Sequence, residues 1–163
     1  MKRRIIAVVS WVIVLWAARV FLLSLPYKFS GHPDTRHIFG TIGDWLSMVV
    51  SEGIGNLFSS YGAYIVGSFE LLTAIVLLLP GLLWLLGLMG LANSRGARPW
   101  FHAYGGLMAS VVMAGAVFFH LFTPLGIEVL HHGKSDGGSL FYSALSILLL
   151  GAVLFFINIR SVR

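Results

Sequence analysis

The sequence predicts an all-α fold, a four-transmembrane-helix bundle that forms a single membrane domain over residues 1–163. Of the 163 residues, 58% are hydrophobic and only 10% are charged, whereas charged residues make up about 25% of an ordinary water-soluble domain. Several apolar runs also reach the roughly 20 residues that a helix needs to cross the hydrocarbon core of a bilayer. We therefore expect a multi-pass protein of the cell membrane, the inner membrane if the source is bacterial, with the lipid bilayer as its partner.

Charge and cysteine content exclude two functional classes. The net charge is +5, but the basic residues do not gather with polar and aromatic residues in one exposed stripe, so we expect no nucleic-acid partner. The sequence has no cysteine, which excludes disulfides, thiolate catalysis and iron–sulfur clusters or metals held by cysteine. Any redox role must therefore depend on a cofactor or on another chain.

The first predicted helix covers residues 5–25 and ends at Pro26. The basic start MKRR before an apolar run is also typical of a signal peptide. The run is about twice as long as the usual apolar region of such a peptide, and no A-x-A-like site follows it, so we expect a retained helix. The third and fourth spanning helices are expected at residues 102–122 and 139–159.

The second spanning helix is predicted over residues 61–92, with a kink or break at Pro80. A straight helix of that length would reach about 45 Å, well beyond a hydrocarbon core of about 30 Å. Pro80 is followed directly by a glycine. The part after Pro80 is too short to cross a membrane alone, so it either extends a tilted helix or lies along the interface.

A polar connection over residues 26–60 is predicted to contain a short amphipathic helix in the outer loop between the first two spanning helices. Asp34 is placed to cap its start, and Gly53 and Gly55 are expected to end it. We interpret this helix as lying on the membrane surface, or as a lid on the mouth of the bundle, rather than as a re-entrant loop. Its apolar side chains recur at helical spacing: Ile38, Phe39, Ile42, Trp45, Leu46, Val49 and Val50.

The third spanning helix carries small residues that would let another helix approach closely. This pattern indicates a packing face and not a dimerisation motif, because bulky residues interrupt it. The small residues are Gly105, Gly106, Ala109, Ser110, Ala114, Gly115 and Ala116.

The distribution of basic residues predicts that both termini are cytoplasmic. Cytoplasmic loops carry the excess of lysine and arginine in membrane proteins. With four crossings, the loops opposite the termini contain only Lys28, Arg36 and Lys134 together with all the loop acids. The side of the termini holds Lys2, Arg3, Arg4, Arg95, Arg98, Arg160 and Arg163.

Glu70 lies well inside the second spanning run, and an ionisable group at such a depth is a hypothesis for a functional site. In the predicted topology Arg19 and His120 fall in the same outer-leaflet slab. We expect Arg19 to form a buried ion pair with Glu70, although it could also snorkel to the headgroups. Such a pair could orient two helices, line a pocket for a ligand or a proton relay, or be absent if Glu70 is protonated. The predicted polar cluster consists of Arg19, Lys28, Glu70, His120 and Glu128.

The histidines do not predict a metal site. No H-x-x-x-H or H-E-x-x-H spacing places two ligands on one helical face, and the adjacent His131 and His132 point in different directions in any regular structure. His102 is expected to be an interfacial residue near the cytoplasmic side. No nucleophile elbow or phosphate-binding glycine loop occurs, so the catalytic residues are unknown.

Four stretches of the chain resemble the DoxX and DoxX-like family of small four-helix membrane proteins. They are RVFLLSLPYKFSGHP, GSFELLTAIVLLLP, VVMAGAVFFHL, and LGIEVLHHG followed by SLFYSAL. The family takes its name from a subunit of a thiosulfate:quinone oxidoreductase, and some members resemble membrane organisers of oxidative-stress complexes. The resemblance therefore implies a role near membrane redox chemistry, with quinone as the cofactor it would allow, and carries over no active site.

Three functions remain open at this point. The first is an accessory subunit or organiser of a quinone-linked or oxidative-stress redox system, with membrane or peripheral redox proteins as partners and no autonomous catalytic activity. The alternative is a carrier or binding protein for a lipophilic molecule or a proton-coupled small solute. The third is a bundle whose buried charges only specify packing.

Overall fold

The computed structural model describes residues 2–91 and 96–162 and contains five helices and one pair of very short strands. Four of these helices have the length and apolar composition to cross a membrane, which confirms the predicted all-α fold with four helices suited to spanning. The elements in order are α1 (Lys2–Phe29), α2 (Pro33–Val49), α3 (Glu52–Leu88), α4 (Ala97–Phe122), β1 (Leu130–His131), β2 (Lys134–Ser135) and α5 (Ser139–Val162).

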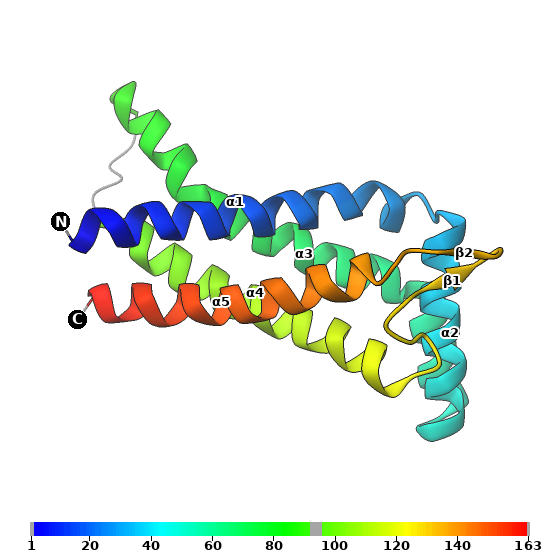
Figure 1. The fold of residues 1–163 in the computed structure, drawn as a ribbon. Helices are drawn as coiled ribbons and strands as arrows, with labels where there is room; N and C mark the ends of the chain where they lie inside the picture. Colours follow the sequence, from blue (N-terminus) through cyan, green and yellow to red (C-terminus); the bar gives the residue numbers. More distant parts are fainter. Residues whose placement is uncertain (1, 92–95, 163) are drawn as a thin grey trace.

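The four long helices α1, α3, α4 and α5 run along one another, and α2 lies across one end of this bundle (Figure 1). The antiparallel strands β1 and β2 lie at the same end, which we call the α2 end. Both chain termini lie at the opposite end, which we call the termini end (Figure 1). The chain therefore crosses the length of the bundle four times and returns to the end at which it began.

The bundle buries one face of each long helix at its centre and leaves many apolar side chains on the outer faces exposed. Phe21 of α1, Leu77 of α3 and Ile147 of α5 are almost fully buried, whereas Val8 and Val111 are each 64% exposed. Outward-facing aliphatic side chains over the whole length of a helix suit contact with lipid tails. Association of the helices then depends on close packing more than on the hydrophobic effect.

The closest approach of α4 and α5 requires two glycines. A Cβ atom placed on Gly106 would lie 2.7 Å from the carbonyl oxygen of Gly151, and one placed on Gly151 would lie 2.6 Å from Ser110 Oγ. Ser110 Oγ donates a hydrogen bond to the carbonyl of Leu148 across the same contact, at 2.8 Å. The predicted packing face is therefore correct for part of its residues: Gly105, Gly106, Ala109 and Ser110 are buried, but Ala114 and Gly115 are exposed.

The prediction that the first helix ends at Pro26 is wrong, because α1 continues to Phe29 with Pro26 inside it. A proline lacks the N–H that would bond one turn back, but its carbonyl can still accept from the following turn. Ser30 N donates to Pro26 O at 3.0 Å, which closes this last turn. As a result Ser24 and Lys28, four residues apart, lie on one helical face.

The helix predicted between the first two spanning helices is α2, but its start differs in detail from the expectation. His32 occupies the N-cap position, and its Nδ1 accepts a hydrogen bond from the backbone N–H of Asp34 at 3.3 Å. Asp34 therefore lies in the first turn of α2 instead of capping it. A carboxylate in the first turn still stabilises the helix, because it faces the positive end of the helix dipole.

The spanning helix α3 begins at Glu52, well before the predicted residue 61, so that Gly53 and Gly55 belong to it. Ser51 is its N-cap, and Ser51 Oγ accepts from Ile54 N at 3.4 Å. The early part of α3 lies beside α2, where a Cβ atom on Gly43 would come within 2.8 Å of the Gly55 carbonyl oxygen. Gly55, one of the two glycines expected to end the amphipathic helix, instead lets α2 and α3 cross, whereas a Cβ atom on Gly53 would meet nothing within 4 Å.

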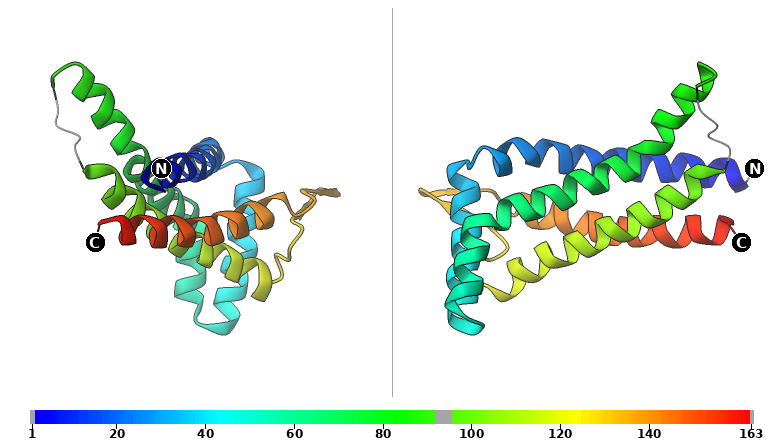
Figure 2. Two further views of the ribbon diagram at one scale, coloured as in Figure 1. Left: turned by 60° about the vertical axis from the view of Figure 1, so that its left-hand side comes forward. Right: turned by 180° about the vertical axis from the view of Figure 1, so that it is seen from behind.

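Of the kink or break predicted at Pro80, the break is wrong, since α3 continues through Pro80 and ends at Leu88. Proline inside a helix usually bends it without ending it. The end of α3 diverges from the other long helices at the termini end (Figure 2). The remaining residues of this predicted helix include Ala92, which lies outside the described residues.

Candidate functional site

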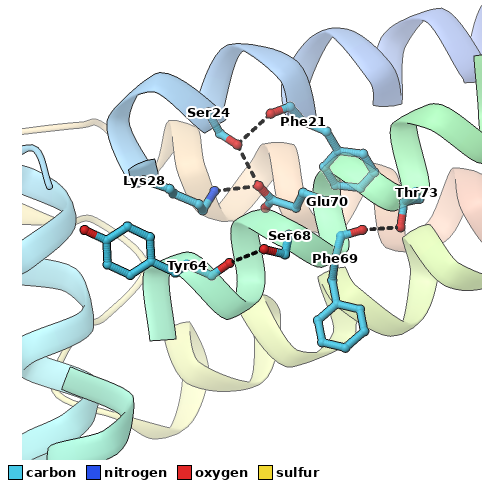
Figure 3. Close-up of polar contacts among 8 residues, drawn as sticks. All are labelled: Phe21, Ser24, Lys28, Tyr64, Ser68, Phe69, Glu70 and Thr73. Carbon is cyan, nitrogen blue, oxygen red and sulfur yellow. Dashed lines mark hydrogen bonds and ion pairs between the residues drawn. The ribbon is translucent and has the colours of Figure 1, made fainter. Parts of the chain in front are cut away.

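Glu70 lies on the face of α3 that meets α1, and its side chain is 5% exposed. Its Oε2 atom accepts two hydrogen bonds, both at 2.7 Å, one from Lys28 Nζ and one from Ser24 Oγ (Figure 3). The lysine side chain is 16% exposed. Lys28 and Glu70 thus form a largely buried ion pair that joins the last turn of α1 to the middle of α3.

Local sequence explains how these groups meet. Phe21, Ser24 and Lys28 follow one another at helical spacing on the buried face of α1, and Phe21 is fully buried. On α3, Gly67 lies one turn before Glu70, and a Cβ atom there would be 3.4 Å from Lys28 Cδ. The same Cβ atom would lie 3.2 Å from Phe29 Cζ, so a side chain at position 67 would crowd the end of α1 that carries Lys28.

The Ser24 hydroxyl can serve either protonation state of Glu70. Its single proton has two acceptors, the carbonyl oxygen of Phe21 and Glu70 Oε2, each 2.7 Å from Oγ. A protonated Glu70 could donate to Ser24 Oγ while Ser24 donates to Phe21 O, because a hydroxyl donates once and accepts through its lone pairs. The nearby hydroxyls of Ser68 and Thr73 bond to carbonyls of α3 itself and take no part in the pair (Figure 3).

The predicted partner of Glu70 was wrong, because the structure pairs Glu70 with Lys28 and not with Arg19. Arg19 is exposed, and its guanidinium carbon lies 5.9 Å from the centre of the Trp16 ring. At about 100° per residue, Arg19 is roughly 200° around the helix from Phe21. It therefore faces away from α3, and its snorkelling to the headgroups stays a prediction.

The other two members of the predicted cluster lie apart from the ion pair. His120 is buried near the end of α4, where its Nδ1 is 2.7 Å from the carbonyl oxygen of Gly126. Glu128 is in the following loop and accepts a hydrogen bond from Ser135 Oγ at 2.7 Å. Both residues hold the loop between α4 and α5, so only Lys28 and Glu70 of the five predicted residues meet.

Four histidines and an aspartate gather on the surface at the α2 end. His131 Nδ1 donates a hydrogen bond to Asp34 Oδ1 at 2.6 Å. The ring of His131 stacks on that of His37, with 4.6 Å between the ring centres, and the ring centre of His132 is 4.1 Å from that of His131. The hydrogen bond from His131 holds the pKa of Asp34 below its ordinary value; slight burial opposes this effect, and the charges of His32, His131 and His132 support it. Within residues 2–91 and 96–162, no three such side chains are arranged to hold a metal ion.

Asp136 organises the start of α5. Its carboxylate accepts hydrogen bonds from the backbone N–H groups of Val129, Gly138 and Leu140 at 2.8, 3.0 and 3.0 Å. Burial raises the pKa of Asp136, but these backbone donors outweigh it and bring the pKa below its ordinary value. The loop between α4 and α5 is thus fixed by a carboxylate that acts as a helix cap.

A second polar group lies inside the termini end and was not predicted as a site. Asn158 of α5 is fully buried, its Nδ2 donates to Ser10 Oγ at 2.9 Å, and its Oδ1 accepts from Arg98 at 3.3 Å. His102 is also fully buried, with the edge of Trp11 packed against it at 4.8 Å. The interfacial depth expected for His102 stays a prediction, and neither of its ring nitrogens has a hydrogen-bond partner among the described residues. The signal in the sequence was a single amide, Asn158, within an otherwise apolar helix.

Comparison of the chain with models of protein families, with curated proteins and with solved structures finds no match in any of the three.

Proposed function

We propose that this chain is a DoxX-like accessory subunit, or organiser, of a membrane redox system linked to quinone or to oxidative-stress protection. It acts in the cell membrane with both termini cytoplasmic and has no autonomous catalytic activity. The cytoplasmic placement of both termini is supported by the arginines at the termini end, because cytoplasmic segments of membrane proteins carry the excess of basic residues. The function rests on the motif resemblance together with the chemistry of the Lys28 and Glu70 pair.

The observation that carries the proposal is the unused hydrogen-bonding capacity of the ion pair. An ammonium group has three N–H donors, and Lys28 Nζ spends one of them on Glu70. Both bonds to the carboxylate fall on Oε2, so Oε1 accepts none from the described side chains. A quinone headgroup offers carbonyl acceptors to the ammonium, and the reduced quinol offers hydroxyl donors to the carboxylate.

The lack of cysteine supports an accessory role rather than an independent oxidoreductase. Cysteine thiolates and iron–sulfur clusters, the redox groups that a protein most often supplies itself, need cysteine. Electrons would then pass between a quinone and a partner chain, while this protein would hold one or both in the outer leaflet.

Binding of decylubiquinone to the purified protein in lipid nanodiscs tests the ligand part of the proposal. We expect saturable binding that is weakened about tenfold by Lys28→Met, because a charge-assisted hydrogen bond is lost. Arg19→Gln is the matched control, since it removes an exposed cation from the same helix, and it should bind like the wild type. Equal binding by the Lys28→Met variant would contradict the proposed site.

Co-purification tests the partner part. Extraction of the protein in native lipid, followed by mass spectrometry of the bound chains, should recover redox proteins together with this chain. A protein that is isolated alone from several native extractions would contradict the accessory role.

A second candidate, a carrier for a lipophilic or proton-coupled solute, is favoured by the Ser24 hydroxyl. This hydroxyl offers hydrogen bonds to both the charged and the neutral form of Glu70, as proton coupling would require. Glu70→Gln separates the two candidates. It should abolish coupled uptake in a carrier but leave partner co-purification unchanged in an accessory subunit.

A further inference from the structure

Two cavities adjoin one another at the termini end, far along the bundle from the ion pair. One has a volume of about 370 Å³ and is lined by Arg3 and Ile6 of α1, Arg98 and Trp100 of α4, and Ser161 of α5. The other, of about 440 Å³, lies between Trp11, Pro80, Trp84 and Arg98. Each volume falls in the range of about 300 to 1,000 Å³ that is typical of small-ligand sites. Arg98 lines both cavities, so a single ligand could extend from one into the other.

The first cavity is positively charged, and no carboxylate in the described part of the chain neutralises it. All six acidic residues lie elsewhere: five are in α2, at the start of α3 or in the loop before α5, and Glu70 is paired with Lys28. Neither Arg3 nor Arg98 forms an ion pair with any described residue; Arg98 instead bonds to the amide of Asn158. Two guanidinium groups that line one cavity without a counter-ion favour an anionic ligand, which Arg can bind in a bidentate manner.

The start of α4 adds to the same field. Its N-cap is Gly96, and no side chain of the described residues forms a hydrogen bond to the first backbone N–H groups of the helix. Uncapped N–H groups at a helix N-terminus, together with the positive end of the helix dipole, attract phosphate and other anions. Gly96, Arg98 and Pro99 of this first turn all line the cavity.

The second cavity is suited to a hydrocarbon chain. Its lining residues are two tryptophans, a proline, a glycine and Arg98. Gly81 is needed for this shape, since a Cβ atom there would lie 3.0 Å from the Trp11 ring. The end of α3 diverges from the bundle beside it (Figure 2), and Trp84 is 57% exposed on this diverging segment. The cavity is therefore bordered by a lipid-facing part of the helix.

We propose that the termini end binds one anionic phospholipid, with the phosphate between Arg3 and Arg98 at the start of α4 and part of an acyl chain beside Trp84. Arg98 connects the cationic cavity to the apolar one. The cationic cavity suits the headgroup of such a lipid, and the apolar cavity suits its tail. Anionic lipids are also enriched in the cytoplasmic leaflet, where the arginine distribution places this end. The inference does not depend on the proposed redox role.

Native mass spectrometry of the detergent-solubilised protein with added lipid tests the proposal. Palmitoyl-oleoyl phosphatidylglycerol and the matching phosphatidylcholine are compared at equal concentrations. We expect one phosphatidylglycerol to be retained about tenfold more tightly than phosphatidylcholine, and Arg98→Gln to reduce this preference about tenfold, as expected for loss of a charge-assisted contact. Arg98→Lys should retain most of the preference.

Two further variants guard against misfolding and against a general effect of charge. Arg3→Gln removes an exposed cavity cation that has no hydrogen bond to the described residues, so it should weaken phosphatidylglycerol retention without affecting the melting temperature. Arg160→Gln removes an exposed arginine of the same end that does not line the cavity, and should leave retention unchanged. Trp84→Ala should weaken retention of both lipids.

Three outcomes would overturn the proposal. Equal retention of phosphatidylglycerol and phosphatidylcholine would show that the charge of the headgroup is not recognised. A loss in Arg160→Gln as large as that in Arg98→Gln would indicate nonspecific attraction. Complete displacement of the lipid by millimolar inorganic phosphate, with no effect of Trp84→Ala, would identify a site for a free anion instead of a lipid.

Discussion

Replacement of Lys28 by methionine removes the cation from a carboxylate whose side chain is only 5% exposed. Breaking a buried ion pair by removing one partner typically costs about 3 to 5 kcal/mol. Proton uptake limits this cost, because neutralising an ordinary glutamate at pH 7 requires about 3.7 kcal/mol. We therefore expect Lys28→Met to lower the free energy of unfolding by about 3 to 4 kcal/mol. The lower value is the smallest typical cost of breaking a buried pair, and the upper value is the cost of protonating the carboxylate.

The opposite change, Glu70→Gln, should cost less. The remaining Lys28 side chain is 16% exposed and lies in the last turn of α1, so its ammonium can reach water by snorkelling. The glutamine can still bond to Ser24, and the expected cost is about 1 to 2 kcal/mol. In the double variant no charge is left unpaired, so its cost should fall below the sum of the single costs by about 2 kcal/mol.

Steric-trapping or detergent unfolding in bicelles measures these free energies. Arg19→Gln is the control, and it should change the stability by less than about 0.5 kcal/mol, because it alters an exposed position outside the pair. Additive single costs, or a Lys28→Met cost no greater than that of Arg19→Gln, would refute the reasoning.

Three further changes test other parts of the fold. His102→Phe should raise the free energy of unfolding by about 1 to 3 kcal/mol, because it removes two buried ring nitrogens that have no partner among the described residues; a fall in melting temperature would instead reveal an essential polar contact. Gly106→Ala should destabilise by about 1 to 3 kcal/mol, since its Cβ atom would lie 2.7 Å from a carbonyl oxygen of α5, whereas Gly115→Ala, with nothing within 4 Å, should be neutral or slightly stabilising in the same assay. Asp136 has a lowered pKa when folded, so its contribution is present above the unfolded pKa of about 3.9 and is lost as the pH falls through the folded value; hydrogen exchange at the start of α5 should accelerate in that range and, at pH 7, in Asp136→Ala, and equal exchange in both proteins would contradict the capping role.

The general architecture could be predicted from sequence because it depends on the length and polarity of apolar runs. A lipid-facing helix needs about 20 apolar residues wherever it packs, so the four spanning helices follow without knowledge of their neighbours. Their ends were harder to predict. Pro26 and Pro80 both lie inside helices, since proline removes only one hydrogen bond and the flanking turns retain theirs.

The identity of the partner of Glu70 depended on such an end. Once Pro26 is taken as a helix stop, Lys28 is assigned to a loop, and Arg19 is the remaining cation within the first span. Continuation of α1 by one turn places Lys28 on the face of Ser24, and the helical phase turns Arg19 toward the outside. Sequence reasoning therefore located the acid and the lysine, but not their pairing.

The glycines show a similar limit. Gly53 and Gly55 were expected to end a helix, because glycine is a frequent helix terminator. In the structure Gly55 permits the crossing of α2 and α3, and this role depends on a partner helix that local sequence does not reveal. The burial of His102 likewise depends on another helix, since Trp11 of α1 packs against it.

The most direct test of the central claim is the contact between Lys28 and Glu70 itself, measured in lipid bilayers by solid-state NMR with ¹⁵Nζ-lysine and ¹³Cδ-glutamate. Lysine occurs only as Lys2, Lys28 and Lys134, and glutamate only as Glu52, Glu70 and Glu128, so few pairs can contribute. We expect one strong dipolar coupling that matches the 2.7 Å N–O contact and disappears in Glu70→Gln. A wild-type protein without this coupling, or a coupling that persists in Glu70→Gln, would contradict the ion pair on which the proposed site depends.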